Sequence, residues 1–113
     1  MKIFHNPRCS KSRQTLSLIE DKGVDVEIVD YLNHPPSQAE LDRVLKMLDK
    51  QPQELMRKGE AVYKELGLKE KQLTRKEAIR IMCENPKLIE RPIVIQGDKA
   101  VLGRPPENVK ELF

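Results

Sequence analysis

The segment Lys2-Ile3-Phe4-His5-Asn6-Pro7-Arg8-Cys9-Ser10-Lys11-Ser12-Arg13 passes within a few residues from a strand pattern to a helix pattern, so it is the most informative part of the sequence for the fold. Residues 2–5 form a short, mainly apolar segment, and an amphipathic run begins near residue 10. Asn and Pro, which separate the two, are residues typical of turns. The stretch therefore predicts a strand, a tight loop that carries Cys9, and a helix.

The thiol of Cys9 is predicted to lie at the start of this helix. The first backbone N–H groups of a helix have no partner within it, and the helix dipole is positive there. Both features favour a thiolate and bind anions. Arg8, Lys11 and Arg13 add positive charge, so we expect a lowered pKa and a nucleophilic sulfur. The alternative is a buried structural cysteine, which the polar neighbours disfavour.

The pattern of the rest of the chain predicts an α/β fold. Residues 10–22 form a helix that ends at Gly23, and residues 24–29 alternate as a second strand, which the crossover makes parallel to the first. Capping boxes at Ser37 and Thr74, together with Pro52, predict a helical middle. Residues 93–96 and 100–103 flank a two-residue turn as a β-hairpin, and a last helix follows Pro105. The order βαβ…ββα predicts one thioredoxin-like domain over residues 1–113, a mixed sheet with a helical insertion at about 36–86.

Composition narrows the function classes. The chain has 113 residues, two cysteines and a net charge of +3, with two Tyr, two Phe and no Trp. So few cysteines, with no leader segment or long apolar run, predict a protein of the reducing cytoplasm without membrane association. Mixed charges and scarce aromatic residues disfavour nucleic-acid binding. We expect a monomer with no bound cofactor or metal.

Cys9 has no neighbouring cysteine to resolve it. The fourth position of Cys9-Ser10-Lys11-Ser12 is a serine, whose hydroxyl can donate to the sulfur or to a bound anion, or can be a tolerated early-helix residue. Oxidised Cys9 therefore needs an external thiol or Cys83. Cys83 lies on the apolar stripe of a predicted helix, which favours a core residue. His5 either anchors the cysteine loop or favours the thiolate electrostatically.

Arginines elsewhere in the chain are candidates for binding an anion. Pro92 precedes a strand, and a cis proline at this place in a thioredoxin-like domain would aim Arg91 at the thiol; a trans proline at an ordinary strand start is the alternative. Arg57 follows a short helix and Arg104 follows the hairpin. Guanidinium groups suit a tetrahedral oxyanion if the fold gathers them around Cys9.

The chain as a whole resembles the glutaredoxin-coupled arsenate reductases. The resemblance is carried, in order, by His5-Asn6-Pro7-x-Cys9-x-x-Ser12-Arg13, Tyr31-Leu32 with Pro35-Pro36, Leu55-x-Arg57-Lys58, Tyr63-x-x-Leu66-Gly67-Leu68, Pro86-x-Leu88-Ile89-x-Arg91-Pro92-Ile93 and Arg104-Pro105. It implies a catalytic Cys9, an arginine triad of Arg57, Arg91 and Arg104, and a thiolate-supporting His5. It also implies that Cys9 attacks arsenate, that glutathione displaces the adduct and arsenite leaves, and that glutaredoxin reduces the mixed disulfide.

Two other functions are compatible with parts of this pattern. A related branch contains redox-responsive regulators that bind RNA polymerase, but these typically carry Cys-x-x-Cys, which Ser12 disfavours. A thiol oxidoreductase acting on another substrate, such as glutathionylated protein, is the second alternative.

Overall fold

The computed structural model describes all 113 residues. Its internal contacts divide the chain into two compact units, one of residues 1–34 with 91–113 and one of residues 35–90. The second unit is the helical insertion, which begins one residue earlier and ends four residues later than the sequence predicts. The prediction of a single domain over the whole chain stays a prediction.

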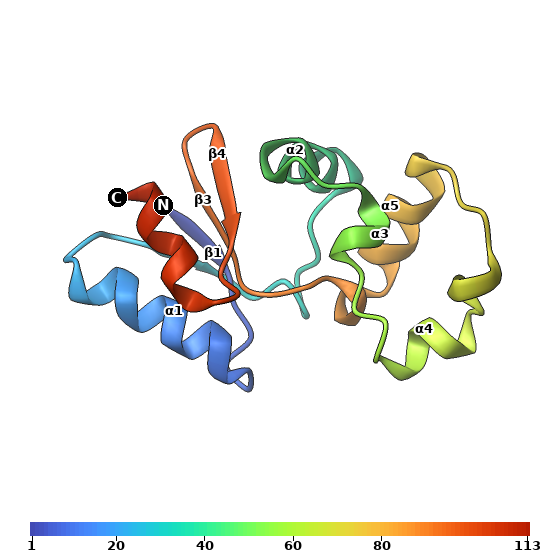
Figure 1. Cartoon of the computed structure of the whole chain (residues 1–113), viewed down its shortest axis with the longest axis horizontal. Helices are drawn as coiled ribbons and strands as arrows, with labels where there is room; N and C mark the ends of the chain where they lie inside the picture. The colour runs from blue at the N-terminus through green and yellow to red at the C-terminus, as the bar shows by residue number, and fades with distance from the viewer. The chain divides into compact units, whose positions relative to one another are not determined.

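The first unit is a four-stranded sheet with two helices (Figure 1). The strand order is β2-β1-β3-β4, with β1 parallel to β2 and antiparallel to β3, and β3 antiparallel to β4. This confirms the predicted mixed sheet and the βαβ…ββα order of a thioredoxin-like fold. Its elements are β1 (Lys2–Phe4), α1 (Ser10–Asp21), β2 (Glu27–Val29), β3 (Ile93–Gln96), β4 (Lys99–Leu102) and the 3₁₀ helix η3 (Pro106–Leu112).

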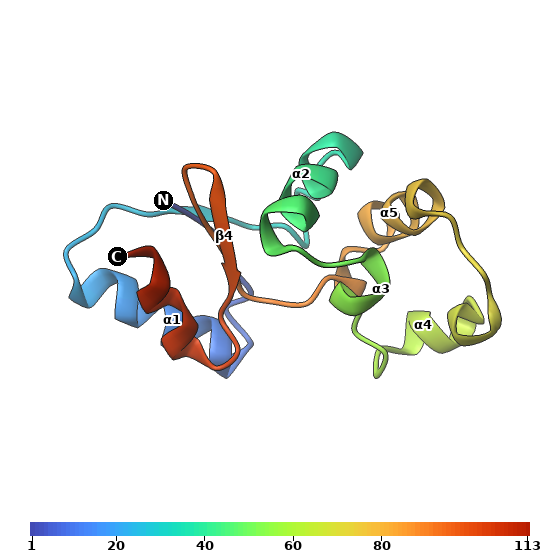
Figure 2. The same cartoon turned by 45° about the horizontal axis from the view of Figure 1, so that its top comes forward.

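Both helices of this unit pack on one face of the sheet. Ile3 and Val94 are register partners on neighbouring strands, and they form a buried cluster with Ile19 of α1 and Val109 of η3. Figures 1 and 2 show η3 (red) beside α1 in both views. Because Cys9 precedes α1 and Arg104 precedes η3, this packing brings the starts of the two helices to one end of the unit.

The second strand is shorter than predicted. Residues 24–26 are outside the sheet, and β2 covers Glu27–Val29. The partner strand β1 has three residues, Lys2–Phe4, so three register pairs complete the ladder. Val24 and Val26 instead pack as partly buried side chains against the cluster of Ile3 and Ile19. Their alternation reflects packing on the core rather than strand pairing.

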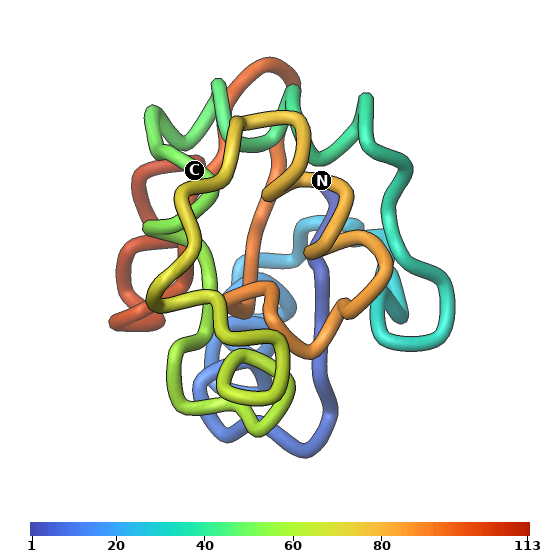
Figure 3. Tube along the Cα trace, turned by 90° about the vertical axis from the view of Figure 1, so that its right-hand side faces the viewer, coloured from blue at the N-terminus to red at the C-terminus, as the bar shows by residue number.

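The second unit is helical. The Thr74–Glu77 capping box is present in full, and the Ser37 hydroxyl accepts from the Glu40 backbone N–H, as predicted. The stretch between η1 and α5 is extended (yellow in Figure 3). The elements are α2 (Gln38–Leu48), α3 (Pro52–Leu55), α4 (Ala61–Glu65), the 3₁₀ helix η1 (Leu68–Glu70), α5 (Arg75–Glu84) and the 3₁₀ helix η2 (Pro86–Leu88).

The hairpin and its flanks follow the prediction closely. Gly97 takes the left-handed conformation at φ 61° in the two-residue turn between β3 and β4. The Arg91–Pro92 bond is cis, and so is the Arg104–Pro105 bond.

None of the helices has both the length and the apolar character that crossing a membrane requires.

Candidate active site

Cys9 is the N-cap residue of α1. Its backbone is extended, with φ −95° and ψ 121°, and its carbonyl accepts the first helical hydrogen bond from the Arg13 N–H at 3.0 Å. The Cys9 N–H donates to the Asn6 carbonyl at 3.0 Å, which closes the loop. The backbone N–H groups of Lys11 and Ser12, in the first helical turn, act on the Cys9 thiol, as the sequence predicts.

The pKa of Cys9 is lowered, although the residue is only 7% exposed. Burial alone would raise the pKa of the thiol. The backbone N–H of Ser12, the hydrogen bond and charge of the Arg91 guanidinium, and the backbone N–H of Lys11 together lower this pKa by more. Cys9 is thus buried, contrary to the expectation from its polar flanks, and it still favours the thiolate. Arg91 lowers the pKa of this thiol, whereas Arg8 and Arg13 of the loop do not contribute to the lowering.

A second arginine also reaches the sulfur. The Arg104 Nη2 atom lies 3.4 Å from the Cys9 Sγ atom. The Arg104 Nε atom donates to the Arg91 backbone carbonyl at 2.8 Å, so the two arginine segments are tied to each other. The predicted gathering of arginines around the thiol is therefore present for Arg91 and Arg104.

His5 and Ser12 form a buried pair beneath the loop. The Ser12 Oγ atom lies 2.6 Å from His5 Nδ1 and accepts the Asn6 backbone N–H at 3.0 Å. Burial and the charge of Arg13 lower the pKa of His5, while Glu20 acts in the opposite direction. A neutral His5 accepts the Ser12 hydroxyl proton at Nδ1 when its own proton is on Nε2, and it donates to the Ser12 oxygen when its proton is on Nδ1. In both tautomers the pair ties the end of β1 to the first turn of α1, which is the geometry of a loop anchor.

Arg57 belongs to the second unit, where two carboxylates bind it. Its Nε atom donates to Glu60 at 3.1 Å, and its Nη1 atom donates to Glu90 at 2.5 Å. Its backbone N–H donates to the Leu88 carbonyl at 2.7 Å. Burial alone would lower the pKa of Arg57, but these carboxylates raise it. Its place in the arginine triad stays a prediction.

Cys83 is a free, half-buried thiol of α5. Burial and the neighbouring carboxylates of Glu84 and Glu40 raise the pKa of its thiol. A raised pKa leaves little thiolate near neutral pH, which suits a packed residue better than a resolving nucleophile.

No cluster of three or more His, Cys, Asp or Glu side chains is placed to hold a metal ion.

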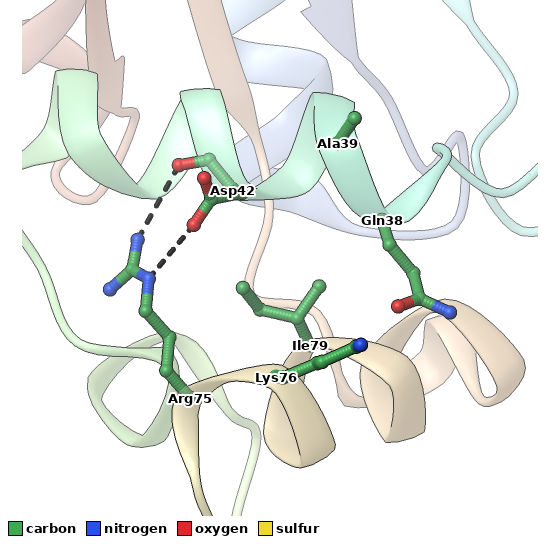
Figure 4. Close-up of a pocket in the computed structure, with 6 residues that line it drawn as sticks. All are labelled: Gln38, Ala39, Asp42, Arg75, Lys76 and Ile79. Carbon is green, nitrogen blue, oxygen red and sulfur yellow. Dashed lines mark hydrogen bonds and ion pairs between the residues drawn. The ribbon is translucent and has the colours of Figure 1, made fainter.

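A cavity of about 370 Å³ lies on the second unit between α2 and α5 (Figure 4). Its most prominent polar feature is the pair between Arg75 and Asp42, with Nε to Oδ1 at 2.8 Å. No cysteine, serine or histidine lines it, so it offers no thiol comparable to that of Cys9. Its lining residues are Gln38, Ala39, Asp42, Arg75, Lys76 and Ile79.

The sequence did not indicate the roles of three residues near Arg104, which are Thr15, Gly103 and Asn108. The Asn108 amide donates to the carbonyls of Leu102 and Arg104, on either side of Gly103. The Thr15 hydroxyl lies 3.4 Å from the Gly103 carbonyl, and Gly103 packs closely against Thr15. Asn108 stands within the first turn of a predicted helix, where an amide has many roles. The only available signal was a glycine directly before an Arg-Pro dipeptide, which marks a close approach of the backbone.

Comparison with known proteins identifies the family of the chain. Residues 4–112, and so both the cysteine loop and Arg104, match the profile of the ArsC family. The chain belongs to the ArsC family. The match spans β1 to η3, so both units are part of the ArsC region.

Several relatives cover the whole ArsC chain. The uncharacterized protein YfgD of Escherichia coli is 50% identical over 99% of this chain and 95% of its own. An arsenate reductase of Neisseria meningitidis is 45% identical over 100% of this chain and 97% of its own. The solved structure of an arsenate reductase from Vibrio cholerae is 45% identical, with a TM-score of 0.94 over 100% of this chain and 98% of that one.

Proposed function

We propose that this ArsC protein is an arsenate reductase with Cys9 as its nucleophile. The observation that carries the proposal is the Arg104 guanidinium 3.4 Å from a thiol whose pKa is lowered. A thiolate beside guanidinium donors and a helix N-terminus can receive a tetrahedral oxyanion. The similarity to arsenate reductases at 45% identity over the full chain supports arsenate as that oxyanion.

In the proposed first step, the Cys9 thiolate attacks the arsenic atom of arsenate. A sulfur–arsenic bond forms, and an arsenate oxygen leaves as water after taking up protons. Arg91 and Arg104 neutralise the charge of the bound oxyanion and hold it in line with the sulfur. Arg57 contributes the third guanidinium of the triad implied by the family.

In the second step, the thiolate of glutathione attacks the Cys9 sulfur. A Cys9–glutathione disulfide forms, the sulfur–arsenic bond breaks, and its electron pair reduces arsenic from the +5 to the +3 state, so that arsenite leaves. A glutaredoxin thiolate then attacks the glutathione sulfur and releases the Cys9 thiolate. Ser12 in the position of a second cysteine supports this external resolution, as does the raised pKa of Cys83.

His5 and Ser12 have a positioning role in this proposal. Ser12 Oγ accepts the Asn6 N–H and lies against His5 Nδ1, so the pair holds the loop that presents Cys9. We further propose that the protein acts as a monomer in the cytoplasm, where glutathione keeps thiols reduced.

A coupled assay tests the proposal. Purified protein is mixed with arsenate, glutathione, glutaredoxin, glutathione reductase and NADPH, and NADPH oxidation is followed. Arsenate-dependent turnover is expected in the parent and in Cys83→Ser, and no turnover in Cys9→Ser. Turnover with thioredoxin alone would refute the glutathione step, and turnover of a glutathionylated peptide without any arsenate activity would favour a different thiol oxidoreductase.

A further inference from the structure

The amide of Asn108 binds the backbone on both sides of one residue. Its Nδ2 atom donates to the Leu102 carbonyl at 3.1 Å and to the Arg104 carbonyl at 3.0 Å. Both partners are acceptors, so the donating nitrogen of the amide is assigned by its surroundings. One side chain of η3 thereby fixes the end of β4 and the main chain of Arg104 together.

Gly103, the residue between Leu102 and Arg104, also contacts Pro92 and Thr15. The Gly103 N–H donates to the Pro92 carbonyl at 2.9 Å, and its carbonyl lies 3.4 Å from the Thr15 hydroxyl. A Cβ atom at Gly103 would lie 2.6 Å from Thr15 Oγ1 and 2.7 Å from Pro92 Cγ. The segment is therefore packed directly against α1, the helix that Cys9 caps.

The Arg104 side chain runs from this fixed backbone to the thiol. It is tied midway by the bond from Nε to the Arg91 carbonyl at 2.8 Å, and its Nη2 atom ends 3.4 Å from Cys9 Sγ. A displacement of the Arg104 main chain would be transmitted to the guanidinium, because the Nε bond leaves the side chain few alternative rotamers.

We propose that Asn108 is a positioning residue that sets the Arg104 guanidinium against the Cys9 thiolate. It touches neither the sulfur nor the oxyanion site directly, and it acts through the main chain of Arg104. Of its two tests, the measurement of KM for arsenate rests on the proposed function, whereas the measurement of Cys9 alkylation does not.

The first test measures the Cys9 thiolate itself. In a Cys83→Ala background, Cys9 is the one thiol left, and its rate of alkylation by iodoacetamide is recorded against pH. Asn108→Ala, and Asn108→Leu as a non-donating variant of similar size, should move the alkylation midpoint to higher pH, in the direction of Arg104→Ala. Adding either substitution to Arg104→Ala should cause no further movement, because the effect passes through Arg104.

Asn85→Ala is the matched control, since its amide also donates to a backbone carbonyl, that of Ile81, at 3.0 Å in the second unit. It should leave the alkylation profile unchanged. Unchanged profiles in folded Asn108 variants, or full additivity with Arg104→Ala, would overturn the proposal. Loss of folded structure in both variants, monitored by circular dichroism, would also overturn it, because Asn108 would then serve the whole unit rather than Arg104.

The second test uses arsenate. The Asn108 variants should raise KM for arsenate by about threefold to tenfold, as expected for one weakened charge-assisted hydrogen bond, with a smaller change in kcat. A parent protein without arsenate turnover would reject the proposed function, and the alkylation result would still decide the role of Asn108.

Discussion

Arg104 and Cys9 are 95 residues apart in the chain, and the Arg104 Nη2 atom lies 3.4 Å from the Cys9 Sγ atom. The contact depends on the packing of η3 beside α1, which places the residue before η3 next to the N-cap of α1. Arg91 acts on the same sulfur from the start of β3 and lowers the pKa of Cys9. The groups around the thiol therefore come from three places, which are Arg91 before β3, Arg104 after β4, and the backbone N–H groups at the start of α1.

Removal of Arg91 should raise the pKa of Cys9. Its hydrogen bond and its positive charge both favour the thiolate, whereas burial favours the thiol. Arg91→Ala should therefore shift the pH profile of Cys9 alkylation upward and slow alkylation at neutral pH. Arg8→Ala is the control, because Arg8 is exposed in the cysteine loop and, unlike Arg91 and Arg104, has no hydrogen bond to the sulfur. An equal shift in both variants would contradict this assignment.

Ionisation of Cys9 should also appear in the stability of the protein. The Cys9 pKa is lower in the folded protein than in the unfolded chain, so the unfolded chain holds more protons between the two values. The free energy of unfolding then rises with pH across this window; the gain is complete above the unfolded pKa and is lost as pH falls through the folded pKa. Urea unfolding of the parent against Cys9→Ser should show a difference that grows toward alkaline pH. A pH-independent difference would contradict a thiolate in the folded protein.

The Ser12 hydroxyl should contribute to stability through the loop. Ser12 is fully buried, and Ser12→Ala leaves both the Asn6 N–H and His5 without this partner. We expect a loss of about 1–3 kcal/mol in the free energy of unfolding, the usual cost of an unsatisfied buried polar group. Ser17→Ala, at an exposed position of the same helix, should change it by less than about 0.5 kcal/mol. Equal effects of the two substitutions in urea unfolding would argue against the anchor.

Local signals in the sequence predicted most of the fold. The Thr74 capping box, the Gly97 turn and the Cys9 N-cap each depend on residues within a few positions of one another, and each is present. The site was less predictable because its geometry is long-range. The nearby charges of the cysteine loop suggested the wrong cations for the thiol, whereas the proline before the hairpin, and then the family resemblance, pointed to Arg91. Neither source indicated Asn108, whose role depends on which carbonyls the fold brings to it.

Arg57 provides a test of the proposed triad. Arg57→Ala removes the cation shared by Glu60 and Glu90, so we expect a loss of about 1–3 kcal/mol in the free energy of unfolding. If Arg57 also binds the oxyanion, KM for arsenate rises as well. Arg75→Ala is the matched control, since it breaks an arginine–carboxylate pair with Asp42 in the same unit and should leave KM unchanged. A stability loss in Arg57→Ala with no change in KM would remove Arg57 from the site.

Gly103 should be intolerant of any side chain. The Cβ atom of Gly103→Ala would meet Thr15 Oγ1 at 2.6 Å and Pro92 Cγ at 2.7 Å, and neither a buried threonine nor a proline ring can easily move away. Overpacking of this kind costs about 1–3 kcal/mol. The backbone shift that relieves it displaces Arg104, so KM for arsenate should rise together with the loss in stability.

Gly59→Ala is the control for Gly103→Ala, because no atom beyond Gly59 and its two chain neighbours lies within 4 Å of the position of its Cβ. It should leave KM unchanged and stability equal or slightly higher, since alanine restricts the unfolded chain. Adding Thr15→Ala to Gly103→Ala removes the closest contact and should restore part of the stability, measured by urea unfolding. Absence of any restoration would show that Thr15 is not the group that excludes a side chain at this position, and would leave Pro92 as the remaining contact.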